Sequence, residues 1–316
     1  MFKNNPSILL SFLLIPLWSF AQYTDQINSN RPGETMSAFA VGKSVIQLET
    51  GAYGISQKHH LLNYVTNGYG IDATIRYGMF KEKLEFLADV QYQSQLYEAR
   101  LITMDQKALK QTVLGAKYLL YDPFKNQEKK VYVYSWKVDK SFKWKQLIPA
   151  VSVFAGANIT SANNPYHFST KAGISPKVIL ITQNHFGDGS WVLVTNTIAD
   201  YIGTEFPSYG YAVTLTKGLN KNWSGFIENQ GYKSDFYSDL IVRSGAAYLV
   251  TKDLQLDVSA SASLKNTPSI FYGGIGFSYR YDGNYKEIRT PIEEDPVSVK
   301  KEKKEKIKKK KRFLIF

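Results

Sequence analysis

Two neighbouring stretches between residues 70 and 93 alternate between apolar and polar positions. In the first, Ile71, Ile75 and Tyr77 alternate with polar or charged residues, and residues 84–92 repeat the pattern except at Leu87. A period of two places each set on one face of a strand, and the short link at 79–82 predicts an antiparallel hairpin. The apolar face would meet a second sheet in a soluble sandwich and lipid in an outer-membrane barrel.

The same alternation continues from Ser44 to about Tyr281 and predicts twelve strands, with no intervening helix of ten residues or more. Their expected ranges are roughly 44–56, 68–79, 82–97, 107–122, 146–158, 175–187, 190–200, 209–217, 222–233, 238–251, 253–265 and 269–282. Links after strands 2, 6, 8 and 10 are short, whereas most links after odd strands are longer, for example 56–67, 98–106 and 160–174. Bacterial barrels combine an even strand number with short periplasmic turns and longer external loops. We therefore predict an all-β fold, a transmembrane antiparallel up-and-down barrel over residues 44–282.

The N-terminus has the features of a signal peptide. Lys3 precedes an apolar run at 8–20, and Ser19 and Ala21 form a small-x-small cleavage site. The run of about 13 residues is shorter than the roughly 20 that a spanning helix needs. These features predict a signal peptide over 1–21, an exported chain, and an integral outer-membrane protein with both termini in the periplasm.

The rarity of catalytic and metal-binding residue types argues against an enzyme. The chain has no Cys and only four His, namely His59, His60, His167 and His185. A missing Cys excludes disulfides and thiol catalysis, and the sequence contains no Gly-x-Ser-x-Gly elbow. We predict neither an enzyme, nor a cofactor, nor a metal site.

Positive charge concentrates outside the predicted strands. Residues 300–312 contain ten Lys and Arg against two Glu, and the link at 122–145 contains seven Lys. Such a block repels itself and is typical of a disordered tail, so residues 283–316 are predicted to be a periplasmic tail. Export makes nucleic acid an unsuitable partner, and lipid headgroups, peptidoglycan or a protein complex remain. The residues expected to bind such a partner are Lys300, Lys301, Lys308, Lys309, Lys310, Lys311, Arg312, Phe313 and Phe316.

Several short motifs resemble a known family. They are Asn30-Arg-Pro-Gly-Glu-Thr35, Ile46-Gln-Leu-Glu-Thr-Gly51, Ile75-Arg-Tyr-Gly78, Leu114-Gly-Ala-Lys-Tyr118 and Asn222-Trp-Ser-Gly-Phe-Ile-Glu228. Their order is similar to that in outer-membrane barrels of the meta-pathway phenol degradation or "transporter" family, of the type found in Bacteroidota. The family usually has Asp where this chain has Asn30. The resemblance implies a barrel that transports hydrophobic or aromatic compounds.

Assigning the apolar face to lipid turns the polar face toward the lumen. The charged residues expected there are Glu49, Asp72, Arg76, Glu85, Asp89, Lys117, Glu228, Arg243, Asp257 and Arg280. They could pair with one another as a polar plug, or line a pore that selects solutes. The segment at 22–43, with Arg31 and Glu34, is a candidate plug, and we expect Arg31 to pair with Glu49 or Glu228.

Two functions follow from these features. The first is passive transport of small hydrophobic or aromatic solutes through the barrel. The alternative is a non-conducting accessory subunit of a larger outer-membrane complex, which would bind partners through the basic tail and the insert at 122–145. A simple pore needs neither addition.

Overall fold

The computed structural model describes residues 26–124, 144–167, 171–187, 189–235 and 237–283. The predicted signal peptide (1–21), most of the basic insert and the tail lie outside these residues. The partner-binding residues expected between Lys300 and Phe316 therefore remain predictions. The described residues up to Asp282 belong to one compact unit.

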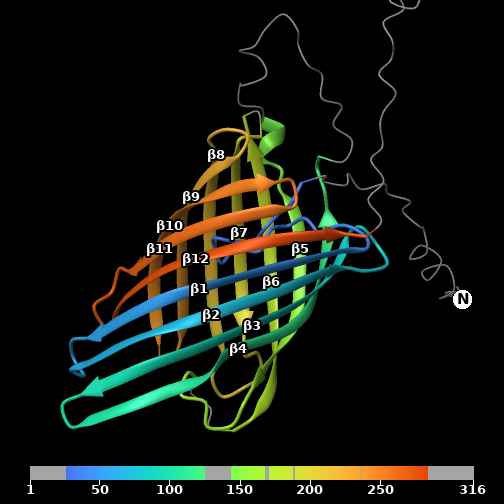
Figure 1. The fold of residues 1–316 in the computed structure, drawn as a ribbon. Coiled ribbons are helices and arrows are strands. Elements are labelled where there is room, and N and C mark those ends of the chain that lie inside the picture. The colour runs from blue at the N-terminus through green and yellow to red at the C-terminus, as the bar shows by residue number, and fades with distance from the viewer. Residues whose placement is uncertain (1–25, 125–143, 168–170, 188, 236, 284–316) are drawn as a thin grey trace, which may run out of the picture. The chain divides into compact units, whose positions relative to one another are not determined.

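Twelve strands form a closed antiparallel barrel, in which each strand pairs with its neighbours in sequence and β1 pairs with β12 (Figure 1). The predicted all-β barrel and its strand number are confirmed. The strands are β1 (Val45–His59), β2 (Tyr64–Gly78), β3 (Leu84–Ala99), β4 (Ile102–Tyr121), β5 (Ala150–Thr160), β6 (Gly173–Phe186), β7 (Trp191–Asp200), β8 (Ser208–Gly218), β9 (Trp223–Ser234), β10 (Ser238–Thr251), β11 (Leu254–Ser263) and β12 (Ser269–Asp282).

The two faces of the wall differ as the alternation predicts. On β1, Ile46 is 44% exposed on the outside, whereas its neighbour Gln47 is 1% exposed in the lumen. On β2, Ile75 is 50% exposed and Arg76 is 0% exposed. Large apolar side chains thus cover the outer surface, as lipid contact requires, and polar groups are enclosed. Among the described residues, no helix is long and apolar enough to cross a membrane.

The links between strands differ from the expected pattern on one side. The long links expected at 56–67 and 98–106 are wrong, because β1 to β4 extend through most of these residues and leave only 60–63 and 100–101 as turns. Polar residues in these stretches alternate with Tyr64, Tyr97 and Met104, so the alternation typical of a strand continues past the expected strand ends. Longer links after odd strands occur only at 161–172 and 201–207.

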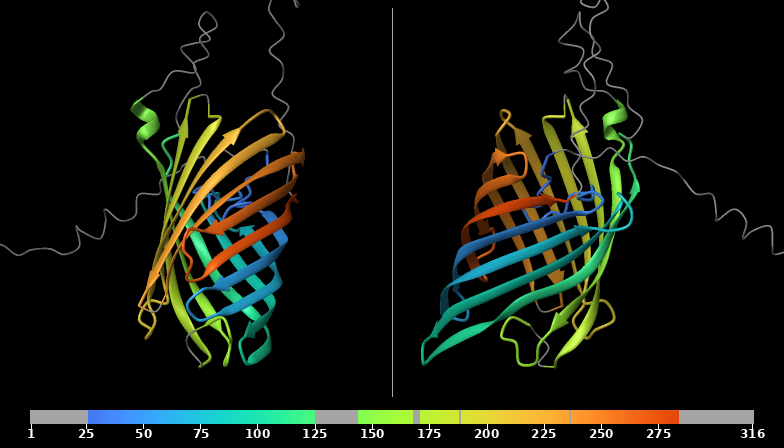
Figure 2. Two further views of the ribbon diagram at one scale, coloured as in Figure 1. Left: turned by 90° about the vertical axis from the view of Figure 1, so that its left-hand side faces the viewer. Right: turned by 45° about the vertical axis from the view of Figure 1, so that its right-hand side comes forward.

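The residues before β1 return into the barrel. In Figure 2 the N-terminal segment, blue, runs inside the ring of strands. We call residues 26–44 the inner segment. We call the end of the barrel where β1 begins and β12 ends the terminal rim, and the other end the opposite rim.

Candidate functional site

The inner segment is held in the lumen by side chains of the wall. Lys117 Nζ donates hydrogen bonds to the carbonyls of Ser37 and Phe39, at 2.6 and 3.0 Å. Gln183 Oε1 accepts the backbone N–H of Ala38 at 2.9 Å. Buried backbone groups need partners, and this non-helical, non-strand segment obtains them from the barrel.

A buried ion network lies beneath the inner segment, on β1 to β4. Arg76 pairs with Glu49 at 2.9 Å and with Glu85 at 3.0 Å, and Lys117 pairs with Glu85 at 2.7 Å. Arg76 also donates to the carbonyls of Asn28 and Phe39. Buried charges cost free energy unless they are paired and hydrogen-bonded. The wall and the inner segment therefore satisfy this network jointly.

Arg31 is held by four residues that form one row across four strands. The pairings Asp257 with Gly276, Gly276 with Gly51, and Gly51 with Asp72 place these residues side by side. The guanidinium forms ion pairs with Asp72 on one side and Asp257 on the other. We call this arrangement the arginine latch.

The two glycines of the latch provide its space. A Cβ built on Gly51 or Gly276 would collide with the Arg31 guanidinium. Glycine is used where a ligand or another chain segment approaches the backbone closely. The row thus combines a floor without side chains with a carboxylate at each end.

We predict that Gly276→Ala weakens the latch without changing any charge. The three atoms nearest to the added methyl group all belong to Arg31, so Arg31 must shift away from Asp257. We expect a glutamate-specific protease to cleave the folded protein faster after Glu34, which lies in the same segment and precedes Thr35. Gly273→Ala, on the same strand, is the matched control, because its methyl group would meet only a Phe271 ring carbon at 3.8 Å. Equal cleavage of both variants would contradict the role of the glycines.

Beyond the latch, the inner segment contacts the other side of the barrel. Glu228 accepts the backbone N–H of Glu34 at 2.9 Å. Arg243 pairs with Glu228 at 2.7 Å and with Glu34 at 3.3 Å. The hydroxyls of Thr35 and Thr214 are 2.9 Å apart. The inner segment therefore spans the lumen from β1 and β2 to β8, β9 and β10.

An apolar cluster covers part of the remaining wall at this level. Phe154 and Ile181 are fully buried and belong to one cluster with Ala38 of the inner segment, against which Met36 and Phe39 pack. Leu87, the exception in the alternation, faces this cluster and is 4% exposed. Hydrophobic contacts thus complement the ion pairs in holding the inner segment.

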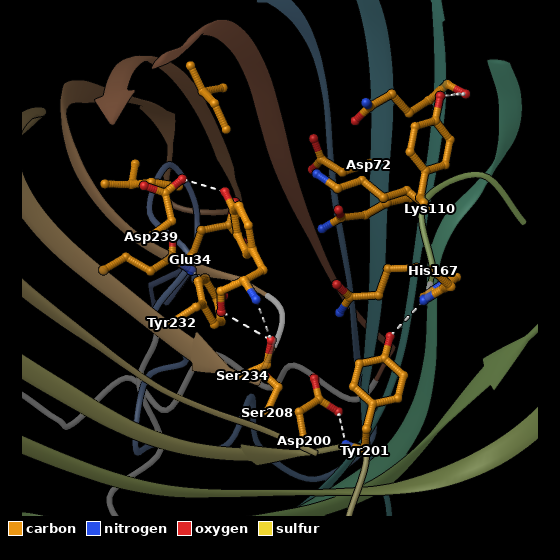
Figure 3. A pocket seen from close by; sticks show the side chains of 18 of the residues that line it. Glu34, Asp72, Lys110, His167, Asp200, Tyr201, Ser208, Tyr232, Ser234 and Asp239 are labelled. Atoms are coloured by element: carbon orange, nitrogen blue, oxygen red, sulfur yellow. Dashed lines mark hydrogen bonds between the residues drawn. The ribbon is translucent and has the colours of Figure 1, made fainter. Parts of the chain in front are cut away.

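A cavity of about 810 Å³ lies between the inner segment and the opposite rim (Figure 3). Residues 31–34 form part of its lining, and the links at 161–172 and 201–207 contribute residues as well. Its lining contains six tyrosines, namely Tyr53, Tyr166, Tyr201, Tyr232, Tyr237 and Tyr272. The volume falls within the roughly 300–1,000 Å³ of small-molecule sites.

The charged residues of the cavity are mostly paired. Lys177 forms an ion pair with Asp200 at 3.0 Å, and Tyr237 donates a hydrogen bond to Asp239 at 2.6 Å. The Tyr201 hydroxyl is 3.0 Å from His167 Nδ1. Burial lowers the pKa of His167, which favours the neutral ring at pH 7.

The structure places all ten expected charged residues on the inner face. Glu49, Arg76, Glu85 and Lys117 lie in the buried network, and Glu228 and Arg243 contact the inner segment. Asp72 and Asp257 belong to the latch. Asp89 accepts a hydrogen bond from the Thr74 hydroxyl at 2.8 Å, and Arg280 forms an ion pair with Asp282 at 3.8 Å. Glu34 pairs with Arg243.

The partners expected for Arg31 are wrong. Arg31 contacts Asp72 and Asp257, whereas Glu49 and Glu228 accept backbone N–H groups of Asn30 and Glu34. The reason is steric, since the glycines beside Asp72 and Asp257 leave room for a guanidinium.

Sequence reasoning missed several residues of the cavity, among them Lys110, Lys177, Asp200 and Asp239. On β6, Lys177 shares the inner face with Ile179 and Ile181, while Val178 and Leu180 point outward. Both faces of this strand are apolar, so the alternation does not identify the inner one. The signal that could have found Lys177 is its pairing with Asp200 of β7, which requires the register.

Comparison with known proteins gives the family. A family model described as the MetA-pathway of phenol degradation matches residues 29–281. The chain belongs to this family. The match begins before Arg31 and ends in β12, so the MetA-pathway family match covers the latch as well as the barrel.

One solved structure supports the same fold. An outer membrane channel from Pseudomonas putida F1 has a TM-score of 0.53 at 11% identity, covering 80% of this chain and 100% of that one. The translocator domain of the autotransporter NalP from Neisseria meningitidis has a TM-score of 0.47 at 9% identity, covering 76% and 89%. None of the curated proteins matches the sequence. In the described residues of this family member, no group of three or more His, Asp or Glu could hold a metal ion.

Proposed function

We propose that this integral outer-membrane barrel transports small solutes passively, and that the inner segment gates the lumen. The observation that carries the proposal is the cavity of about 810 Å³, whose lining includes residues 31–34 of the inner segment. A solute can occupy the half of the lumen near the opposite rim. It passes farther only when the inner segment moves.

The proposed orientation places the terminal rim in the periplasm. With an even strand number, the first strand begins and the last strand ends at the same rim, which in bacterial barrels faces the periplasm. The signal peptide predicted at 1–21 supports this arrangement, as does the pairing of Val45 at the start of β1 with Asp282 at the end of β12. The cavity then faces the cell exterior, and the inner segment closes the periplasmic side.

The cargo that this cavity suits is a small aromatic or hydrophobic solute. Six tyrosines supply ring faces for stacking contacts. Ile55, Ile241 and Ile270 add apolar surface to the same lining. The family description, phenol degradation, agrees with such a cargo.

Flux of phenol into liposomes tests this function. Purified protein in liposomes should admit phenol and small sugars at different rates, with the aromatic solute preferred over a sugar of equal size. Protein-free liposomes measure the leak of phenol through lipid, which must be subtracted. A protein-dependent flux equal to zero for every solute would reject transport.

The plugged lumen favours the accessory subunit as a second candidate. Arg76, Glu85 and Lys117 are fully buried beneath the inner segment, which is an arrangement suited to a closed barrel. In this alternative the basic tail and the insert at 122–145 bind a protein complex, peptidoglycan or lipid headgroups. Affinity purification from native membranes distinguishes the two, because a stoichiometric partner lost on deleting 300–316 supports the accessory role.

A further inference from the structure

Lys110 has an irregular place in β4 and points into the cavity. Gln91 pairs with Gln111 and Tyr92 pairs with Leu109, so Lys110 is an extra residue without a partner on β3. A β-bulge of this kind re-aims a side chain. Lys110 and Gln111 both line the cavity as a result, although they are consecutive.

The Lys110 ammonium has no carboxylate partner within the described part of the chain. Its contacts are the faces of two aromatic rings, 5.9 Å from the Tyr53 centroid and 5.7 Å from the Tyr272 centroid. The Glu34 carboxylate interacts with the ammonium only through long-range electrostatics, because its ion pair is with Arg243. A partly enclosed cation normally has an anionic partner. Lys110 instead lines the cavity, where a ligand could supply the anionic group.

The two aromatic rings beside Lys110 are held by their neighbours. The Tyr53 hydroxyl donates a hydrogen bond to Gln93 Oε1 at 3.0 Å. Gly70 stands opposite Tyr53, and a Cβ there would collide with its ring. The Tyr53 and Tyr272 rings contact each other edge-to-face at 5.9 Å. Both rings are therefore positioned before any ligand arrives.

Apolar surface adjoins this cation. Ile55 pairs with Tyr272 across the β1–β12 ladder, and Ile270 pairs with Gln57 two residues farther along the ladder. Both isoleucines line the cavity and are 5–6% exposed. A ligand that uses both parts has one anionic group and a flat apolar body. Asp72 and Asp239 also line the cavity, and their charge disfavours ligands with several negative groups.

We propose that Lys110, placed against the rings of Tyr53 and Tyr272, binds the carboxylate of a small aromatic acid, with Ile55 and Ile270 contacting the ring of the ligand. This inference rests on the proposed function, because it names the solute class that the cavity selects. Figure 3 shows Lys110 on the wall opposite Tyr232 and Asp239, with open space between them. A single aromatic ring with a carboxylate is small compared with the cavity of about 810 Å³.

Equilibrium binding in detergent tests the site without requiring transport. The probes are benzoate, which is anionic at pH 7, and phenol, which is neutral because its pKa is close to that of tyrosine, about 10. The wild-type protein should bind benzoate more tightly than phenol. Lys110→Gln should weaken benzoate binding about tenfold or more, since a hydrogen bond to a charged group is lost, and leave phenol binding unchanged.

Two further variants complete the test. Lys110→Arg retains the charge. Its benzoate affinity should stay within about threefold of the wild-type value, whereas Lys110→Gln should lose about tenfold. Lys107→Gln removes the same charge from the same strand, where Lys107 is exposed and pairs with Asp105, and should have no effect. Benzoate binding unchanged in Lys110→Gln, or no preference for benzoate over phenol in the wild type, would overturn the proposal. Benzoate binding with no solute flux in liposomes would reject transport and leave this site standing.

Discussion

Replacing Arg31 by alanine is expected to convert a closed barrel into a conducting one. The substitution removes the cation between Asp72 and Asp257, whose side chains are 20% and 0% exposed. Breaking a buried ion pair costs about 3 kcal/mol or more. A loss of that size raises the population with the inner segment undocked about a hundredfold. Planar-bilayer recordings should show more frequent and longer openings.

The matched control for Arg31→Ala is Arg100→Ala. Arg100 lies in the exposed turn between β3 and β4, so the substitution removes the same side chain outside the lumen. It should leave conductance unchanged. If Arg31→Ala and Arg100→Ala had the same open probability as the wild type, the latch would not hold the inner segment.

Glu85→Gln is expected to have the largest effect on stability. Glu85 is the common partner of Arg76 and Lys117, and all three side chains are 0% exposed. The variant leaves two buried cations with one carboxylate, Glu49. Uncompensated buried charge lowers the free energy of unfolding by about 3–5 kcal/mol. Urea unfolding in liposomes, followed by tryptophan fluorescence, measures this difference.

Asp105→Asn is the control for Glu85→Gln, because it makes the same carboxylate-to-amide change in an exposed ion pair. Asp105 and Lys107 have side-chain exposures of 66% and 55%. Surface substitutions change stability within about 0.5 kcal/mol. A Glu85→Gln effect as small as that of Asp105→Asn would show that the network is not needed for stability.

The fold was predictable because lipid imposes one pattern on every strand. Alternation at Ile71, Ile75 and Tyr77 identifies the outer face, and twelve such stretches identify the barrel. The prediction failed where strands extend past the expected boundary, as at Tyr64 and Ile102. Strand pairing there is stabilised by the partner strand, which local sequence does not show.

The site was less predictable because it depends on register and on a bulge. The arginine latch needs Asp257, Gly276, Gly51 and Asp72 in one row, and that row forms only when β12 pairs with β1. Lys110 has the parity of a lipid-facing residue counted from Lys117. One extra residue in β4 reverses this parity, and such an insertion is invisible in the pattern of one strand.

The most direct test of gating fixes the inner segment to the wall. The hydroxyls of Ser29 and Ser278 are 2.6 Å apart, and the chain has no Cys, so Ser29→Cys with Ser278→Cys provides a single cross-link between them. These two substitutions are combined with Arg31→Ala, and the current through one bilayer is recorded before and after reduction. We expect a closed barrel in the oxidised protein and sustained conductance after reduction. Equal conductance in both states, with the cross-link verified by mass spectrometry, would contradict gating by the inner segment.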